Sequence, residues 1–306
     1  MTDQPLRIGT RGSPLALWQA EHVERLLSAA GHATDVVPIK TTGDKVTDRP
    51  LAEIGGKGLF TKELDLALAD GRIDLAVHCV KDMETMIAPE MAFPAILPRE
   101  DPRDALMTRM GRGLDGLPEG AVIGTTSLRR QAQLLAYRPD LKMTLFRGNV
   151  HTRLNKMVAG SADATLLAVA GLTRLEMTDS ITEVLTVDVM LPAVGQGALA
   201  IACRADDQAT AEALAPFDDS KARAEITAER AMLATLDGSC RTPIAGLAWH
   251  EGGQLHLRGL VAEADGSAVW RGERQGPVRD AEAIGNDLGQ DLRQQAGEDF
   301  FRRLAT

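Results

Sequence analysis

The stretch Leu75-Ala76-Val77-His78-Cys79-Val80-Lys81-Asp82 decides the fold of this chain. Its first six residues are mostly apolar and include two valines, a pattern typical of a buried strand of a parallel sheet rather than of one helix face. In open α/β sheets, ligands bind in the crevice outside the carboxyl ends of the strands. The stretch therefore predicts an α/β protein in which Asp82 can meet a ligand cation and Lys81 an anion. A solvated pair that only closes a strand would show the same pattern.

The composition is that of a globular protein. The chain has 306 residues, of which 44% are hydrophobic and 25% charged, enough for about two domains. The net charge of −9 and the aromatic content of 3% argue against nucleic acid or an anionic membrane as a partner. Cys79, Cys203 and Cys240 show no CxxC spacing, which argues against a zinc site or disulfides and for a reducing compartment. No secretory signal or spanning apolar run is recognised, so we expect a cytoplasmic protein.

Two similar α/β lobes are predicted from the order of apolar runs and helix caps. Gly9-Thr10-Arg11-Gly12-Ser13 and Gly124-Thr125-Thr126-Ser127 both link a strand to a helix, and Ser13 followed by Pro14 is a strong helix start. Four prolines between Pro89 and Pro102 are interpreted as the exit from the first lobe. Two facing lobes of this kind suggest a ligand cleft.

The rest of the chain completes these lobes and adds a module. The apolar run 198–203 is assigned to the first lobe, so that the chain crosses between the lobes twice. Residues 41–57, with glycines and no periodicity, are predicted to form a mobile loop. The predicted domains are residues 1–98 plus 198–217, residues 103–192, and residues 221–306, the last a small α+β module with three strands and a final amphipathic helix from 280.

Six arginines lie at predicted strand ends or helix starts, namely Arg11, Arg129, Arg130, Arg147, Arg153 and Arg174. Helix N-termini carry unpaired N–H groups and a partial positive charge, and the planar guanidinium group binds carboxylates through two bonds. These positions predict a ligand with several carboxylates or phosphates, and the absence of a P-loop or a GxGxxG motif disfavours phosphates. The alternative is that these arginines pair with nearby acidic side chains.

Two further residues are candidates for chemistry. Cys240 lies in a loop beside Arg241, where a thiol has thiolate character and can be reached. Since no protease-like His partner is recognised, a permanent covalent attachment point fits better than a turnover nucleophile, and an inert cysteine is the alternative. Asp82, buried in a cleft, could keep a proton near neutral pH, because burial raises the pKa of a carboxyl group. The positive charges of Lys81 and the arginines would lower that pKa. The histidines show no metal-ligand spacing, so no metal is expected.

The chain resembles the porphobilinogen deaminase (hydroxymethylbilane synthase) family. The similarity follows the family's order over nearly the whole chain and rests on these stretches: Thr10 to Ala20, Gly55-Gly56-Lys57-Gly58-Leu59-Phe60, His78 to Asp82, Arg99 to Asp104, Ser127-Leu128-Arg129-Arg130-Gln131, Arg147-Gly148-Asn149-Val150, Leu167 to Leu172, Leu191 to Ala198, and the Cys240 loop. The resemblance implies three domains, the first two like the lobes of a periplasmic binding protein.

The resemblance also implies a function. The family joins four porphobilinogen molecules head to tail with loss of ammonia, and water then releases hydroxymethylbilane. Cys240 would hold a dipyrromethane cofactor by a thioether, and Asp82 would be the catalytic carboxylate that stabilises the azafulvenium cation. The acetate and propionate groups would be held by Arg11, Ser13, Lys81, Ser127, Arg129, Arg130, Arg147, Arg153 and Arg174. Substrate or loop contacts are expected for Lys57, Phe60 and Gln196.

The sequence departs from the family pattern at a few positions near these motifs. Cys79 replaces a usual serine, Met83-Glu84 a hydrophobic-Pro pair, Glu53 a basic residue and His151 a glycine. None of them replaces Asp82 or Cys240, so we expect the activity to be retained. Nothing in the sequence suggests an extended interface, so we expect a monomer. The alternative function is a cytosolic binding module or sensor for a polycarboxylate, which would not need Cys240.

Overall fold

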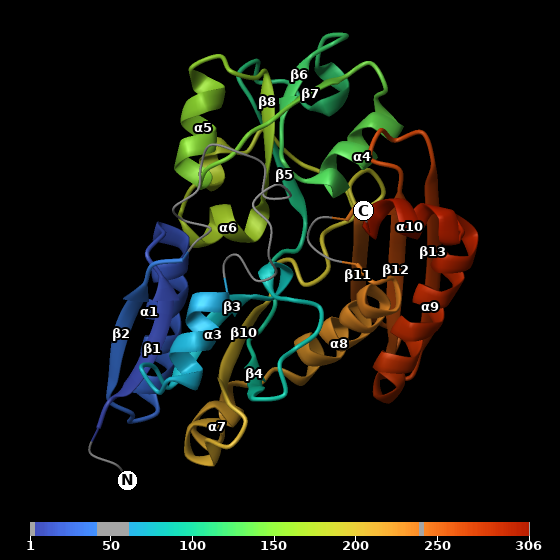
Figure 1. The fold of residues 1–306 in the computed structure, drawn as a ribbon. Helices are drawn as coiled ribbons and strands as arrows, with labels where there is room; N and C mark the ends of the chain where they lie inside the picture. The colour runs from blue at the N-terminus through green and yellow to red at the C-terminus, as the bar shows by residue number, and fades with distance from the viewer. Residues whose placement is uncertain (1–3, 42–60, 239–241, 306) are drawn as a thin grey trace. The chain divides into compact units, whose positions relative to one another are not determined.

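The computed structural model describes residues 4–41, 61–238 and 242–305 (Figure 1). The predicted loop over residues 41–57 therefore lies, except for Thr41, outside the described residues. Two compact units are present: residues 1–99 with 198–223, and residues 100–197 with 224–306. Among the described residues, no helix has the length and apolar character needed to cross a membrane.

The first unit is built on a five-stranded sheet with the order β2-β1-β3-β10-β4. Its strands are β1 (Leu6–Arg11), β2 (Thr34–Ile39), β3 (Leu75–Cys79), β4 (Met91–Ile96) and β10 (Leu199–Arg204). Its helices include α1 (Pro14–Ala29), α3 (Lys62–Ala69) and α7 (Gln208–Leu214). Separate apolar clusters cover the two faces of the sheet, one with Leu27 of α1 and one with Leu64 of α3. Burial on both faces explains why β3 is a continuous apolar run.

The second unit contains a sheet with a corresponding arrangement, β7-β6-β8-β5-β9. The strands are β5 (Asp104–Thr108), β6 (Val122–Gly124), β7 (Lys142–Thr144), β8 (Ala164–Ala168) and β9 (Glu183–Val184), and the helices are α4 (Leu128–Tyr137), α5 (Val150–Val158) and α6 (Val169–Arg174). In both sheets the first three strands are parallel and the fourth strand is antiparallel to the third. The two sheets therefore repeat one topology.

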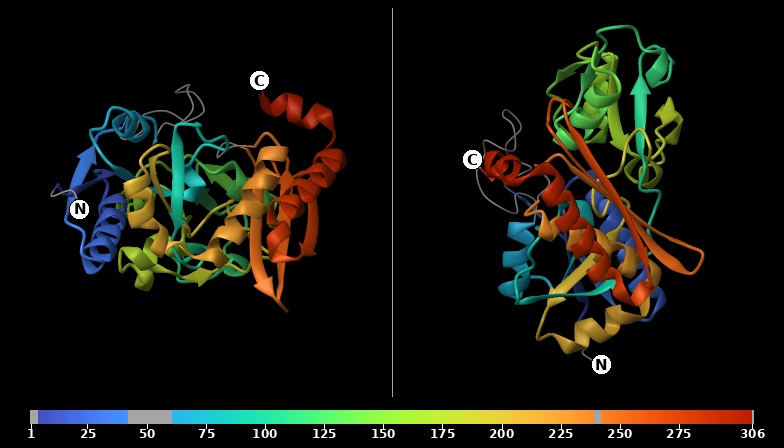
Figure 2. Two further views of the ribbon diagram at one scale, coloured as in Figure 1. Left: turned by 90° about the horizontal axis from the view of Figure 1, so that it is seen from below. Right: turned by 90° about the vertical axis from the view of Figure 1, so that its right-hand side faces the viewer.

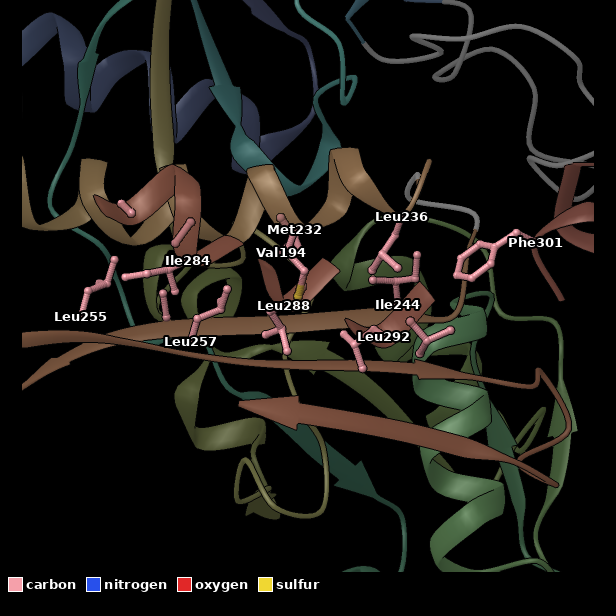
Figure 3. Packing of buried hydrophobic residues seen from close by; sticks show 14 of the residues in the cluster. Val194, Met232, Leu236, Ile244, Leu255, Leu257, Ile284, Leu288, Leu292 and Phe301 are labelled. Atoms are coloured by element: carbon pink, nitrogen blue, oxygen red, sulfur yellow. The ribbon is translucent and has the colours of Figure 1, made fainter. Parts of the chain in front are cut away.

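The second unit also holds a three-stranded antiparallel sheet, formed by β11 (Ile244–Glu251), β12 (Gln254–Ala262) and β13 (Val269–Gly276). Helices α8 (Ser220–Thr235) and α9 (Ala281–Ala296) lie beside this sheet, and α10 (Glu298–Ala305) follows (Figure 2). Met232 of α8 and Leu288 of α9 belong to one buried cluster with Leu257 of β12 (Figure 3). The predicted fold class, two α/β lobes with a small α+β module, is confirmed, while the exact domain bounds remain a prediction.

The return of the chain to the first lobe is confirmed, because β10 pairs with β3 and with β4. Three strands were not predicted, and one of them, β9, has only two residues. The proline-rich stretch interpreted as an exit contains β4, which includes Pro94 and forms an edge of its sheet, where a missing N–H is tolerated. The third is β5, whose sequence Asp-Ala-Leu-Met-Thr is short and has no alternation.

His78 of β3 makes the first unit sensitive to acid. Its side chain is buried, and its Nε2 has no hydrogen-bond partner among the described residues. Burial lowers the pKa of His78 to about 4. A histidine in the unfolded chain titrates near pH ~6.5, so the unfolded state binds more protons than the folded state between these values, and stability is lost as the pH falls. We expect His78 alone to lower the free energy of unfolding by about 2–3 kcal/mol between pH 7 and pH 4.

Urea unfolding of the wild type and of His78→Phe between pH 4 and pH 8 measures this effect. Burial raises the pKa of Asp65 to about 6, so Asp65 titrates in the same range with the opposite sign. The difference between the two proteins isolates His78, because Asp65 is present in both. His78→Phe should lose less stability in acid than the wild type, and the exposed-site variant His151→Gln should behave like the wild type. Equal slopes for the wild type and His78→Phe would contradict this assignment.

Candidate active site

In the first unit, the predicted ligand residues follow two neighbouring strands. Arg11 is the last residue of β1, and Ser13 follows two residues later. Lys81 and Asp82 follow β3 and are separated from it only by Val80. Strands β1 and β3 are parallel and adjacent, so the four residues belong to one edge of the sheet. Ser13 is the N-cap of α1, and its Oγ accepts a hydrogen bond from the backbone N–H of Ala16 at 3.4 Å. The first turn of α1 contains no acidic residue, so its positive end is available to an anion.

Asp82 is exposed, so the expectation that it is buried is wrong. The strand ends in a single 3-10 turn, Val80–Asp82, whose first residue packs into the core with 2% of its surface exposed. The backbone N–H of Val80 also bonds to the carbonyl oxygen of Ala198 at 3.1 Å. Because Val80 anchors the turn, the last residue of the turn extends away from the core. The carboxylate of Asp82 is therefore accessible to a ligand.

Because Cys79 and Cys203 both lie in apolar runs, the sequence predicts that both are buried. Cys203 is buried, but Cys79, next to this turn, is only partly buried. The Nε2 of Gln19, from α1, lies 3.0 Å from the Sγ of Cys79. The side-chain amide of Gln19 therefore forms a hydrogen bond with the thiol of Cys79.

In the second unit, the same edge of the sheet carries the predicted residues. Ser127 follows β6, Arg147 follows β7, and Arg174 ends α6, which follows β8. These strands are parallel neighbours in the order β7-β6-β8. Ser127 is the N-cap of α4 and accepts from the backbone N–H of Arg130 at 3.4 Å, as Ser13 does for α1. The predicted similarity of the two serine turns is confirmed.

Arg129 and Arg130 are buried around one carboxylate. Arg129 Nη1 lies 2.8 Å from Asp104 Oδ2, and Arg130 Nη2 lies 2.6 Å from Asp104 Oδ1. Gln196 Nε2 donates to the same Oδ1 at 3.1 Å. Burial alone would raise the pKa of Asp104, but the two guanidinium groups outweigh it and hold the pKa well below its ordinary value. For these two arginines, the alternative interpretation is correct, because both pair with the acidic side chain of Asp104.

The Asp104 cluster nevertheless carries an excess positive charge. Arg129 and Arg130 are 5% and 6% exposed, and Asp104 is 0% exposed. Two buried cations around one buried anion give a net charge of +1, and burying an uncompensated charge is unfavourable. The cluster therefore suits an additional anion.

Arg147 supplies the clearest sign of a ligand. Its Nη1 is buried and has no hydrogen-bond partner among the described residues. It stands just before α5, whose N-cap Asn149 accepts from the backbone N–H of Thr152 at 2.9 Å and whose first turn has no acidic residue. Arg153 Nε donates to the carbonyl oxygen of Gly148 at 2.9 Å. A buried guanidinium N–H without an acceptor among the described residues, beside a positive helix end, fits an anionic group such as a carboxylate.

Three predicted residues belong to parts of the chain that the structure does not describe, and the sequence analysis missed one residue of the site. Lys57, Phe60 and Cys240 lie outside the described residues. Within the described ranges, no group of three or more His, Cys, Asp or Glu side chains is arranged to hold a metal ion.

Asp104 is the residue of the site that the sequence analysis missed. It belongs to the motif Arg99 to Asp104, but no role was predicted for it. Its signal is the unusual placement of a carboxylate at the start of an apolar segment, which requires a buried partner.

Comparison with known proteins agrees with this geometry. The family model described as "Porphobilinogen deaminase, dipyromethane cofactor binding domain" matches residues 6–212, and "Porphobilinogen deaminase, C-terminal domain" matches residues 223–294. A porphobilinogen deaminase of Paracoccus denitrificans is 54% identical over 301 residues, covering 97% of this chain and 96% of that protein. The chloroplastic porphobilinogen deaminase of Pisum sativum is 51% identical, covering 97% and 83%.

Among solved structures, the ancestral cationic amino acid solute binding protein AncCDT-1 is similar with a TM-score of 0.41 and 16% identity, covering 70% of this chain and 87% of that one. That likeness is too weak to support an inference, and the two-lobe description rests on the matching strand orders. The family models and the relatives together cover nearly the whole chain. The chain belongs to the porphobilinogen deaminase family, whose members are transferases with a dipyrromethane cofactor-binding domain.

Proposed function

We propose that the chain condenses four porphobilinogen molecules head to tail on a covalently bound dipyrromethane, releases one ammonia per addition, and frees hydroxymethylbilane by hydrolysis. The observation that carries this proposal is the placement of the candidate residues at the carboxyl ends of parallel strands in both units. The edge in the first unit presents the carboxylate of Asp82 together with the cations of Arg11 and Lys81, and the edge in the second unit presents guanidinium groups. This division matches a substrate that is anionic in its side chains and passes through a cation during the reaction.

Asp82 is proposed as the catalytic carboxylate. Loss of an amino group from porphobilinogen generates a positive charge that extends over the pyrrole ring. An accessible carboxylate held by an anchored turn can stabilise that charge and assist proton transfer to the departing nitrogen. Lys81, the preceding residue, is proposed to bind a substrate carboxylate instead.

The remaining candidates are proposed to bind and orient carboxylates. In the first unit these are Arg11 and Ser13, and in the second unit Ser127, Arg129, Arg130, Arg147, Arg153 and Arg174. Arg147 offers a buried N–H, while the Asp104 cluster offers excess positive charge. Substrate or loop contacts are proposed for Lys57, Phe60 and Gln196. Holding each ring in a fixed position raises the effective concentration of the reacting carbon atoms.

Cys240 is proposed as the attachment point of the cofactor by a thioether bond. When bound, the dipyrromethane supplies the pyrrole carbon to which the first substrate is joined. Cys240 lies in the sequence between α8 and β11, and residues of both elements belong to one buried cluster. We further propose a cytoplasmic monomer without nucleic acid or membrane partners, consistent with a net charge of −9.

An intact mass measurement tests this function. Purified protein should exceed the mass of its sequence by two pyrrole units, and it should react with a pyrrole-specific colour reagent. Cys240→Ser should lack both signals, whereas Cys79→Ser should keep them because only Cys240 carries the cofactor. A wild type of unmodified mass would instead support a binding module, and an extra mass retained by Cys240→Ser would move the attachment to another residue.

A further inference from the structure

Glu229 of α8 is a fully buried carboxylate that the proposed chemistry does not use. It is 0% exposed. Its Oε2 accepts from the backbone N–H of Gly195 at 2.7 Å, and its Oε1 accepts from the backbone N–H of Ala248, in β11, at 2.8 Å. A carboxylate is costly to bury unless its oxygen atoms receive hydrogen bonds. Here each oxygen receives one backbone N–H, so Glu229 joins two segments that are far apart in the sequence.

The residues after Gly195 contact Asp104, the partner of Arg129 and Arg130, and Arg174. Gln196 Nε2 donates to Asp104 Oδ1 at 3.1 Å and to the carbonyl oxygen of Pro102 at 2.6 Å. The carbonyl oxygen of Gly197 accepts from Arg174 Nη2 at 2.7 Å. Three consecutive residues, 195–197, thus connect Glu229 with Asp104 and Arg174. The orientation of these side chains depends on how that turn is held.

The turn needs such support because of its backbone. Gly195 has a φ of 73° and Gly197 a φ of 90°, in the region that only glycine adopts readily. A segment with two glycines has many alternative conformations. Val194 fixes one end by packing with Met232 and Ile244 (Figure 3), and Glu229 fixes Gly195 itself.

We propose that Glu229 is a positioning residue of the active site. It holds the turn 195–197 so that Gln196 orients Asp104 with its two arginines and Gly197 orients Arg174. This proposal rests on the proposed function, in which those arginines bind the carboxylates of substrate and cofactor. Glu229 lies on the helix that precedes the Cys240 segment, so it also links the cofactor-bearing module to the arginines of the second unit.

The test compares Glu229→Gln with Glu225→Gln. Glu225 is a matched control because it lies one turn earlier on α8, is also buried, and has His250 Nε2 at 3.8 Å. Glutamine at 229 presents an NH₂ group to one of the two backbone N–H groups, so one contact is lost. We expect hydrogen exchange of the backbone amides of residues 193–197 to accelerate about tenfold in Glu229→Gln and to stay unchanged in Glu225→Gln.

Kinetics supply a second readout. We expect Glu229→Gln to raise the KM for porphobilinogen about tenfold and to change kcat by less than about twofold, because the arginines bind substrate and transition state alike. The variants Gln196→Ala and Glu229→Gln should not be additive: the double variant should be no worse than the more severe single variant. Independent losses that multiply would overturn the proposal.

Uniform acceleration of exchange throughout the protein, with an unchanged KM, would also overturn it. If Glu229→Gln does not fold, Glu229→Asp makes the same test, since it keeps the charge but is too short to reach both amides. Hydrogen exchange does not depend on activity. A wild type that fails to consume porphobilinogen would reject the proposed function, while the exchange comparison would still decide the role of Glu229.

Discussion

Asp82→Ala is expected to lower the turnover of porphobilinogen by about 10³-fold while the protein keeps its fold and its cofactor. A positioned carboxylate that assists proton transfer and stabilises a developing charge contributes about 10²–10⁴ in rate. The side chain of Asp82 is exposed, so its removal should change the free energy of unfolding by less than about 0.5 kcal/mol. Initial rates, intact mass and thermal unfolding of one preparation measure the three quantities together.

Two comparisons make this result specific. Asp82→Glu keeps a carboxylate and should retain more activity than Asp82→Ala. Asp70→Asn removes another exposed carboxylate, at the end of α3 in the same unit, and should leave the rate unchanged. Turnover by Asp82→Ala within about tenfold of the wild type would remove Asp82 from the catalytic role.

Asp104→Asn is expected to lower the free energy of unfolding by about 3–5 kcal/mol, because removing one partner of a buried ion pair leaves an uncompensated buried charge. In this variant the guanidinium groups of Arg129 and Arg130 would remain buried next to a neutral amide. Urea unfolding at neutral pH measures the loss. Removing one of the two cations as well, in Asp104→Asn with Arg130→Gln, should recover part of it.

The control for this variant lies three residues earlier. Asp101 pairs with Arg103 at 2.6 Å, but the two side chains are 25% and 45% exposed. A pair of this kind contributes up to about 1 kcal/mol, so Asp101→Asn should be correspondingly mild. Equal effects of Asp101→Asn and Asp104→Asn would show that the buried cluster contributes no more to stability than a surface ion pair.

The difference between these two aspartates illustrates what could be predicted from the sequence. Local signals placed the serine caps, the strand that ends at Cys79 and the return of the chain through β10. The same signals located the arginines at strand ends. They did not separate Arg129, which is buried against Asp104, from Arg147, whose Nη1 has no acceptor among the described residues.

The sequence by itself determined the α/β class, the order of the main elements and the family, because apolar periodicity, caps and motifs are encoded by neighbouring residues. Only the tertiary structure decided which charges meet. Asp104 and Arg130 are 26 positions apart, and Gly195 and Glu229 are 34 apart. It also decided that Asp82 is exposed, because the buried Val80 orients that turn. Contacts over such separations depend on how sheets and helices pack, and no local pattern records that packing.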